Sequence, residues 1–98
     1  MTTSTTTLEP ATTADLRRGD IVHLHGMRLY LDTDPRTFTG TGGRAVHYVD
    51  AEITNFDHLV ALAETDPLTA GLIVSTCRDG RYPLQGHGGR RWQREPRA

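Results

Sequence analysis

The chain has 98 residues, a formal net charge of −1 and 36% hydrophobic residues. This length accommodates one domain with a modest hydrophobic core. The single cysteine, Cys77, excludes a disulfide bond or a cysteine-rich zinc finger within these residues. All 11 basic residues are arginine, which we attribute to codon bias in a GC-rich genome.

The charge is distributed unevenly along the chain. Residues 78–98 contain six arginines and two acidic residues, a net charge of +4, whereas residues 1–77 contain five arginines and ten acidic residues, a net charge of −5. A basic segment of this kind is typical of contact with an anionic partner. The slightly negative charge of the whole chain argues against a dedicated nucleic-acid-binding protein.

Residues 1–14 are rich in threonine and show no apolar periodicity. Such a segment buries too little apolar surface to offset the entropy lost on ordering it, so we predict that it is disordered. It lacks the features of a secretory signal or a transit peptide, and no apolar run in the chain has the length of a transmembrane helix. We therefore expect a cytoplasmic protein without membrane contact, whose single domain covers residues 15–95.

The domain is expected to begin with a β-hairpin. Two short apolar runs, "IVHL" and "MRLYL", are separated by a turn at His25-Gly26. The tripeptide Arg18-Gly19-Asp20 precedes the first run, and we interpret it as a turn that leads into a strand rather than as an adhesion motif. The following residues 35–43 begin with a proline and contain three glycines, which predicts a loop.

The middle of the chain predicts a long strand followed by a helix. Residues 44–54 alternate between an apolar and a more polar face, as in a partly covered strand. From Phe56 to Ala63 the apolar residues recur at helical spacing, with Asn55 as the expected cap and Pro67 as the end. The apolar run at residues 71–77 predicts a buried central strand.

The C-terminal part predicts two further strands. Asp79-Gly80 is a turn signal, and Pro83 places the strand that follows it at a sheet edge. Residues 91–94 can form a last short strand. Five or six short strands with one helix predict a mostly β domain, SH3-like in style, with a strongly bent antiparallel sheet or a partly open barrel.

Two segments of this sequence, "LRRGDIVHLHGMRLYL" and "DGRYPLQGHGGRRWQRE", resemble a family of small proteins from actinobacterial phages and related prophages. In that family an L-x-x-G-D-x-V opening is paired with a closing D-G-x-W-x-x-Q-G segment and a later tryptophan. The matching residues are Leu16, Gly19, Asp20, Val22, Asp79, Gly80, Gln85, Gly86 and Trp92. Tyr82 stands where a tryptophan is more usual. The resemblance covers roughly the ordered domain; it implies a phage or mobile-element origin and implies no particular activity.

A His-x-His pair is the strongest candidate for metal chemistry. On a strand, His23 and His25 would point to one face and could share a metal ion. Such a pair would support a small metal-dependent hydrolase, which we keep as an alternative function. The sequence fixes no third ligand, so we favour histidines packed on a half-exposed strand and expect no metal or other cofactor.

Other catalytic signals are weaker. Cys77 and Ser75 are possible nucleophiles, but Cys77 ends an apolar run and is expected to be a small buried side chain. The acidic pairs Asp32/Asp34 and Asp50/Glu52 could act in acid–base catalysis or bind a cation. We favour solvated charges that protect sheet edges.

The C-terminal segment is the preferred binding site. Arginines around a tryptophan can pair with phosphates or carboxylates and can stack on a partner. The predicted site residues are Arg81, Arg90, Arg91, Trp92 and Arg94, although Trp92 could instead close the core. We expect a non-enzymatic accessory module that contacts a protein partner, or alternatively nucleic acid. A structural component of a virion or assembly is a third alternative.

Overall fold

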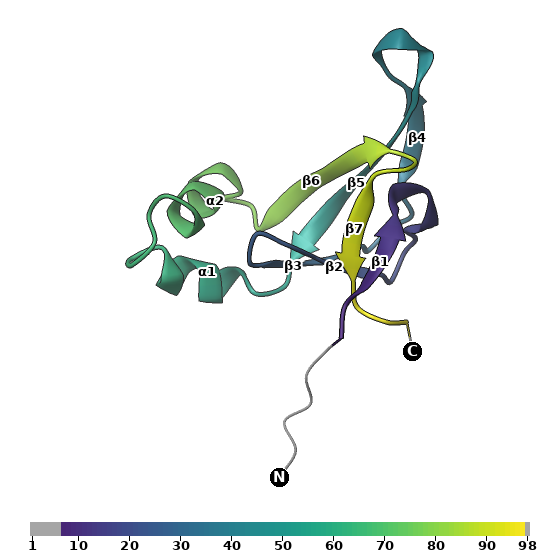
Figure 1. The fold of residues 1–98 in the computed structure, drawn as a ribbon. Coiled ribbons are helices and arrows are strands. Elements are labelled where there is room, and N and C mark those ends of the chain that lie inside the picture. The colour runs from purple at the N-terminus through teal and green to yellow at the C-terminus, as the bar shows by residue number, and fades with distance from the viewer. Residues whose placement is uncertain (1–6, 98) are drawn as a thin grey trace.

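The computed structural model describes residues 7–97, which form one antiparallel sheet of seven strands together with two short α-helices (Figure 1). The strands are β1 (Glu9–Thr12), β2 (Ile21–Leu24), β3 (Met27–Tyr30), β4 (Arg36–Thr39), β5 (Ala45–Ile53), β6 (Arg81–His87) and β7 (Arg91–Arg94). The helices are α1 (Phe56–Leu62) and α2 (Ala70–Thr76), and two 3₁₀ turns are η1 (Thr13–Asp15) and η2 (Thr41–Gly43). The prediction of a mostly β domain is confirmed.

The sheet is organised around its longest strand, β5. The strand order is β1-β7-β2-β3-β5-β4, and β6 also pairs with β5. Strand β3 pairs with the C-terminal end of β5, and β4 pairs with its N-terminal half, whereas β6 runs along most of its length. No pairing among the described strands closes this sheet into a barrel, so the sheet is open, as both predicted arrangements allow.

The predicted hairpin is confirmed. Strands β2 and β3 pair from Ile21↔Tyr30 to Leu24↔Met27, which leaves His25 and Gly26 as the turn. Both turn residues have positive φ, +49° and +83° respectively, as a two-residue turn that follows the twist of the strands requires. Asn55, predicted to cap α1, instead secures this hairpin. Its side chain accepts a hydrogen bond from the Arg28 amide and donates one to the Gly26 carbonyl.

The core lies on one face of the sheet and is covered at one end by the helices (Figure 1). On β5 the side chains alternate as predicted, with Val49, Ala51 and Ile53 buried. Helix α1 also forms where its spacing predicts it, and Leu59 is its buried residue. The buried hydrophobic residues are Ala11, Leu16, Val22, Met27, Leu29, Leu31, Val49, Ala51, Ile53, Leu59, Ala70, Cys77, Leu84 and Trp92.

The prediction that residues 1–14 are disordered is wrong for residues 9–14. Strand β1 pairs with β7 along its whole length, and Thr13 is buried. Residues 1–6 lie outside the described residues. An edge strand can be stabilised by backbone hydrogen bonds to its neighbour, and these leave no hydrophobic pattern in the sequence. The domain also extends beyond its predicted C-terminal limit, because Arg97 binds Asp20.

Two other segments differ from their predictions. Residues 70–76 form α2 rather than a central strand, so the chain has two helices in the described region instead of one. A short apolar run is ambiguous between a strand and a helix, and α2 packs against α1, an arrangement that local sequence does not specify. Residues 36–39 form β4 within the predicted loop. All four are exposed, so this strand depends on pairing with β5 rather than on burial. Neither helix has the length and apolar character of a membrane span.

Candidate binding groove

Successive side chains of β7 point to opposite faces of the sheet, so the residues of the predicted Arg/Trp site do not share one surface. Arg91 and Gln93 are exposed on this strand, whereas Trp92 and Arg94 are buried. Trp92 is only 4% exposed, and its indole Nε1 donates a hydrogen bond of 2.7 Å to Thr13 Oγ1. The alternative that Trp92 belongs to the core is therefore correct. A ligand can reach neither the ring nor the buried guanidinium in this fold.

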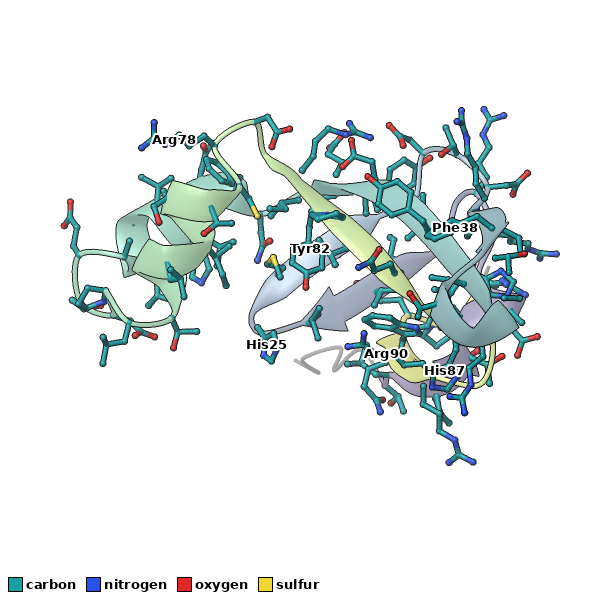
Figure 2. The ribbon with its side chains drawn as sticks, turned by 90° about the horizontal axis from the view of Figure 1, so that it is seen from above. His25, Phe38, Arg78, Tyr82, His87 and Arg90 are labelled. Carbon is teal, nitrogen blue, oxygen red and sulfur yellow. The ribbon has the colours of Figure 1, made fainter. Side chains whose placement is uncertain are left out.

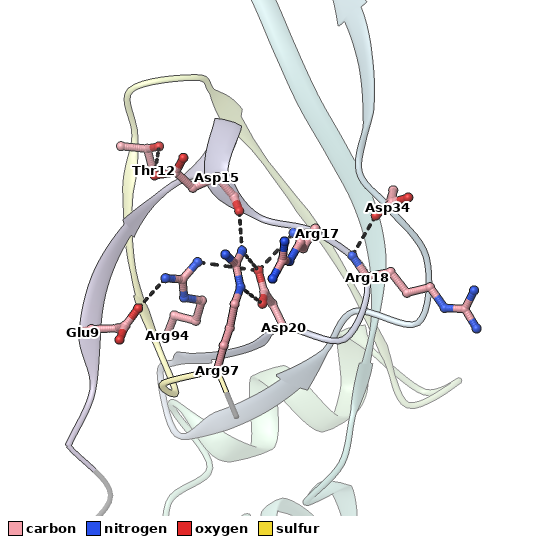
Figure 3. Close-up of polar contacts among 9 residues, drawn as sticks. All are labelled: Glu9, Thr12, Asp15, Arg17, Arg18, Asp20, Asp34, Arg94 and Arg97. Atoms are coloured by element: carbon pink, nitrogen blue, oxygen red, sulfur yellow. Dashed lines mark hydrogen bonds and ion pairs between the residues drawn. The ribbon is translucent and has the colours of Figure 1, made fainter.

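Arg94 belongs to an internal ion network with the other end of the chain (Figure 3). It forms ion pairs with Glu9 and, at 3.7 Å, with Asp20. The buried Asp20 carboxylate also accepts two hydrogen bonds of 2.8 Å from Arg97 and one of 3.0 Å from the Arg17 amide. Burial opposes the ionisation of Asp20, but these hydrogen bonds and the nearby guanidinium charges keep its pKa below its usual value.

Arg81 is also committed to acidic residues of the same chain. Its Nη2 lies 2.8 Å from an Asp32 carboxylate oxygen, and its Nε lies 3.1 Å from Asp50. The hydrogen bond with Asp32 and the charges of both partners raise the pKa of Arg81. Three of the six C-terminal arginines, Arg81, Arg94 and Arg97, thus bind carboxylates from the acidic part of the chain. Much of the charge asymmetry in the sequence is internal complementarity.

The two histidines of the predicted pair have different environments. His23 Nε2 lies 2.6 Å from Glu95 Oε2, and the same carboxylate accepts hydrogen bonds of 2.7 and 3.1 Å from Arg28. The hydrogen bonds from Arg28 and His23 lower the pKa of Glu95 to about 2. His25 lies in the hairpin turn, so the two-residue alternation of a strand does not apply to it. Within residues 7–97 no group of three or more metal-ligating side chains is assembled.

The predicted nucleophiles occupy structural positions. Cys77 is buried in the core, as predicted, and this burial raises the pKa of its thiol. Ser75 is exposed on α2, where its hydroxyl donates a hydrogen bond to the Leu72 carbonyl. Of the acidic pairs, Asp32 and Asp50 are bridged by Arg81, and Asp34 accepts a hydrogen bond from the Arg18 amide. These contacts stabilise loops and strand ends.

A surface groove is lined by residues of the β4–β5 hairpin and of the β6–β7 segment. The hairpin extends from the sheet at one end of the molecule (Figure 1). The volume of the groove is about 450 Å³. The groove is lined by Phe38, Thr41, Arg44, Val46, Gln85, Gly86, His87 and Arg90. Strand register explains part of this arrangement, because Phe38 pairs with Val46 and Val46 pairs with His87 across three adjacent strands. Directly paired residues share one face of a sheet, so these three side chains form a row.

The groove combines an apolar surface with free positive charge. Phe38 is 48% exposed, and Val46 beside it is partly buried. Arg44 and Arg90 are exposed, and neither forms an ion pair with any residue between 7 and 97. Figure 2 shows Phe38, His87 and Arg90 in the half of the molecule that lies away from the helices. The groove thus suits a ligand with an apolar group and a negative charge.

Arg90 is held in place by its contact with the core residue Trp92. Its guanidinium carbon lies 4.1 Å from the centre of the Trp92 ring, and its Nη1 donates a hydrogen bond to the Gln85 carbonyl. The close approach of Arg90 requires glycine at position 86, because a Cβ there would lie 2.8 Å from Arg90 Cδ. The exposed Arg91 does not line this groove.

Of the groove residues, Arg90 is predicted from the sequence, whereas Phe38, Arg44 and His87 are not among the predicted site residues. Phe38 and Arg44 lie on either side of a glycine-rich turn within the predicted loop, and only the pairing of β4 with β5 brings Phe38 next to Val46. Threonine and phenylalanine are both common in strands, so the sequence "TFT" at residues 37–39 is the local feature that indicates β4. Comparison of the chain with models of protein families and with curated proteins gives no match.

Proposed function

We propose that this chain is a non-enzymatic accessory module of phage or mobile-element type that binds a protein partner through the groove. The proposal rests on the row formed by the exposed Phe38 and the partly buried Val46 beside Arg44 and Arg90, two arginines without an ion pair among residues 7–97. The proposed surface differs from the Arg/Trp segment predicted from the sequence, of which it retains Arg90. The phage origin is supported by the sequence resemblance alone.

The chemistry of the groove favours an apolar side chain next to a carboxylate. Burial of apolar surface contributes about 25 cal/mol per Å², so contact with Phe38 would supply most of the binding free energy. Ion pairs at an exposed rim contribute only about 0–1 kcal/mol each, but they select an acidic partner and accelerate its association. We therefore expect modest affinity that weakens as the salt concentration rises.

Nucleic acid is the second candidate, since arginines beside an exposed aromatic ring can bind phosphates and stack a base. Two observations make it the weaker one. Trp92 is buried, and Arg90 already covers its ring, which leaves Phe38 as the aromatic residue available in the groove. The chain also has a net charge of −1, whereas nucleic-acid-binding domains are usually basic.

Fluorescence anisotropy can test this proposal with three labelled probes: an acidic peptide containing leucine, the same peptide with serine in place of leucine, and a single-stranded oligothymidine. We expect the leucine peptide to bind best, and Arg44→Glu/Arg90→Glu to lose that binding. Arg17→Glu/Arg18→Glu is the matched control, because it makes the same charge change at exposed residues outside the groove. Preferential binding of the oligonucleotide would support the second candidate, and no binding of any probe would refute both.

A further inference from the structure

The exposed large hydrophobic residues of the described chain form two groups. One is Phe38 in the groove, and the other consists of Val60, Leu62, Leu68 and Leu72, which lie on α1, α2 and their connection. We call this second group, together with residues 63–69, the helical knob. Leu68 is 85% exposed and Leu72 is 62% exposed. Apolar exposure of this extent in a small domain typically marks an interaction surface.

The connection that carries Leu68 is held in a defined conformation. Asp66 Oδ1 accepts a hydrogen bond from the Thr69 amide, and the Asp66 carbonyl accepts one from the Gly71 amide. The Asp66 amide in turn donates to the Leu62 carbonyl. Pro67 restricts the backbone immediately before Leu68. The leucine is therefore presented on an ordered turn, which reduces the entropy lost when it binds.

The helical knob and the groove have opposite charges. Residues 60–72, which span the knob, contain two acidic residues, Glu64 and Asp66, and no arginine. The groove lining contains two arginines and a histidine and no acidic residue. The knob thus has the chemistry that the groove favours, which is an exposed leucine next to a carboxylate.

We infer that the partner bound in the groove is a second copy of this chain, whose helical knob inserts Leu68 against Phe38 and places Asp66 near Arg44 and Arg90. The inference rests on the proposed function, because it assigns the partner of the same groove. Charge complementarity between two exposed apolar surfaces of one chain supports it.

The placement of the two surfaces determines the form of the assembly. The helices and the β4–β5 hairpin lie at opposite ends of the molecule (Figures 1 and 2). When the knob of one copy occupies the groove of a second copy, the groove of the first and the knob of the second stay free. The contact therefore joins unlike surfaces, in a head-to-tail manner. Contacts of this type produce open chains, or rings where the rotation closes.

Sedimentation velocity from micromolar to millimolar concentration tests the inference. The wild type is expected to form a series of oligomers that shortens at high salt. Leu68→Ser and Arg44→Glu/Arg90→Glu should each be monomeric at concentrations where the wild type associates. Leu68 is largely exposed, so its substitution spares the core. Arg44→Glu alone keeps the contact between Arg90 and Trp92 and should also weaken association.

The decisive measurement mixes the two monomeric variants. Leu68→Ser retains an intact groove and the double arginine variant retains an intact knob, so the mixture should give one-to-one dimers and no larger species. Arg17→Glu/Arg18→Glu should assemble like the wild type. Wild-type protein that stays monomeric, or association that persists in Leu68→Ser, would overturn the inference. In that case, retained binding of the acidic leucine peptide would leave the proposed function standing, and binding of oligothymidine instead would identify nucleic acid as the occupant.

Discussion

Arg90 covers one face of the Trp92 ring, with 4.1 Å between its guanidinium carbon and the ring centre. The two residues are close in sequence, and both were candidates for the same binding surface, yet they have different roles. Trp92 is buried and bonded to Thr13, whereas Arg90 is exposed and lines the groove. The core tryptophan therefore helps to position a side chain of the candidate site.

Replacement of Trp92 is expected to destabilise the whole domain. Trp92→Ala removes a large buried side chain and leaves the Thr13 hydroxyl without its donor, and substitutions of this kind cost about 3–5 kcal/mol. Urea denaturation followed by far-ultraviolet circular dichroism measures this loss. Arg91→Ala, at the neighbouring exposed position, should change the free energy of unfolding by no more than about 0.5 kcal/mol. Equal effects of both substitutions would contradict a core position for Trp92.

Among the carboxylates of the ion network, Asp20 is expected to be the one whose substitution destabilises the fold most. Asp20→Asn removes the charge that faces Arg94 and Arg97 in a buried position. Loss of one partner from a buried ion pair costs about 3–5 kcal/mol, and the partial exposure of Arg97 places the expected loss at the lower end of that range. Thermal or urea unfolding measures it.

Asp34→Asn provides the control for this substitution. Asp34 is exposed, and an asparagine oxygen can still accept the hydrogen bond from the Arg18 amide. We expect its unfolding transition to match that of the wild type. If Asp20→Asn unfolded like the wild type, the ion pairs of Asp20 would contribute nothing to the free energy of unfolding.

Glu95 is expected to make stability depend on pH in the acidic range. Its pKa is about 2 in the folded protein against a usual value of about 4.5, so the unfolded chain binds the proton first. A depressed folded-state pKa contributes stability that is complete above the usual value and is lost as the pH falls towards 2. The difference in melting temperature between the wild type and Glu95→Gln should therefore be largest near neutral pH and shrink below pH 4.5. A difference that is constant from neutral pH to pH 2 would contradict this assignment.

Zinc or manganese is expected to leave the melting temperature of the wild type unchanged. His23 is held by Glu95, and His25 lies in the hairpin turn. Differential scanning fluorimetry with each metal measures this, with His23→Ala/His25→Ala as the comparison. A rise in melting temperature that appears in the wild type and is absent from the double variant would restore the metal-dependent hydrolase as a candidate.

Features that depend on local pattern could be predicted from the sequence. The mostly β class, the turn at His25-Gly26, the alternation of β5 and the position of α1 follow from apolar periodicity and turn residues. The burial of Cys77 follows from its place at the end of an apolar run. Within the candidate site, Arg90 was predicted because it belongs to a basic segment near the C-terminus.

Features that depend on contacts between distant residues were decided by the tertiary structure. Pairing with β7 orders β1, and packing against α1 makes α2 a helix. Arg81 and Arg94 were both candidate ligand contacts. In the fold, Arg81 forms an ion pair with Asp32, and Arg94 forms one with Asp20. The groove likewise exists only where β4 and β6 flank β5. Local sequence encodes the preferences of each segment, but whether an exposed charge or strand meets a partner depends on which segments the fold brings together.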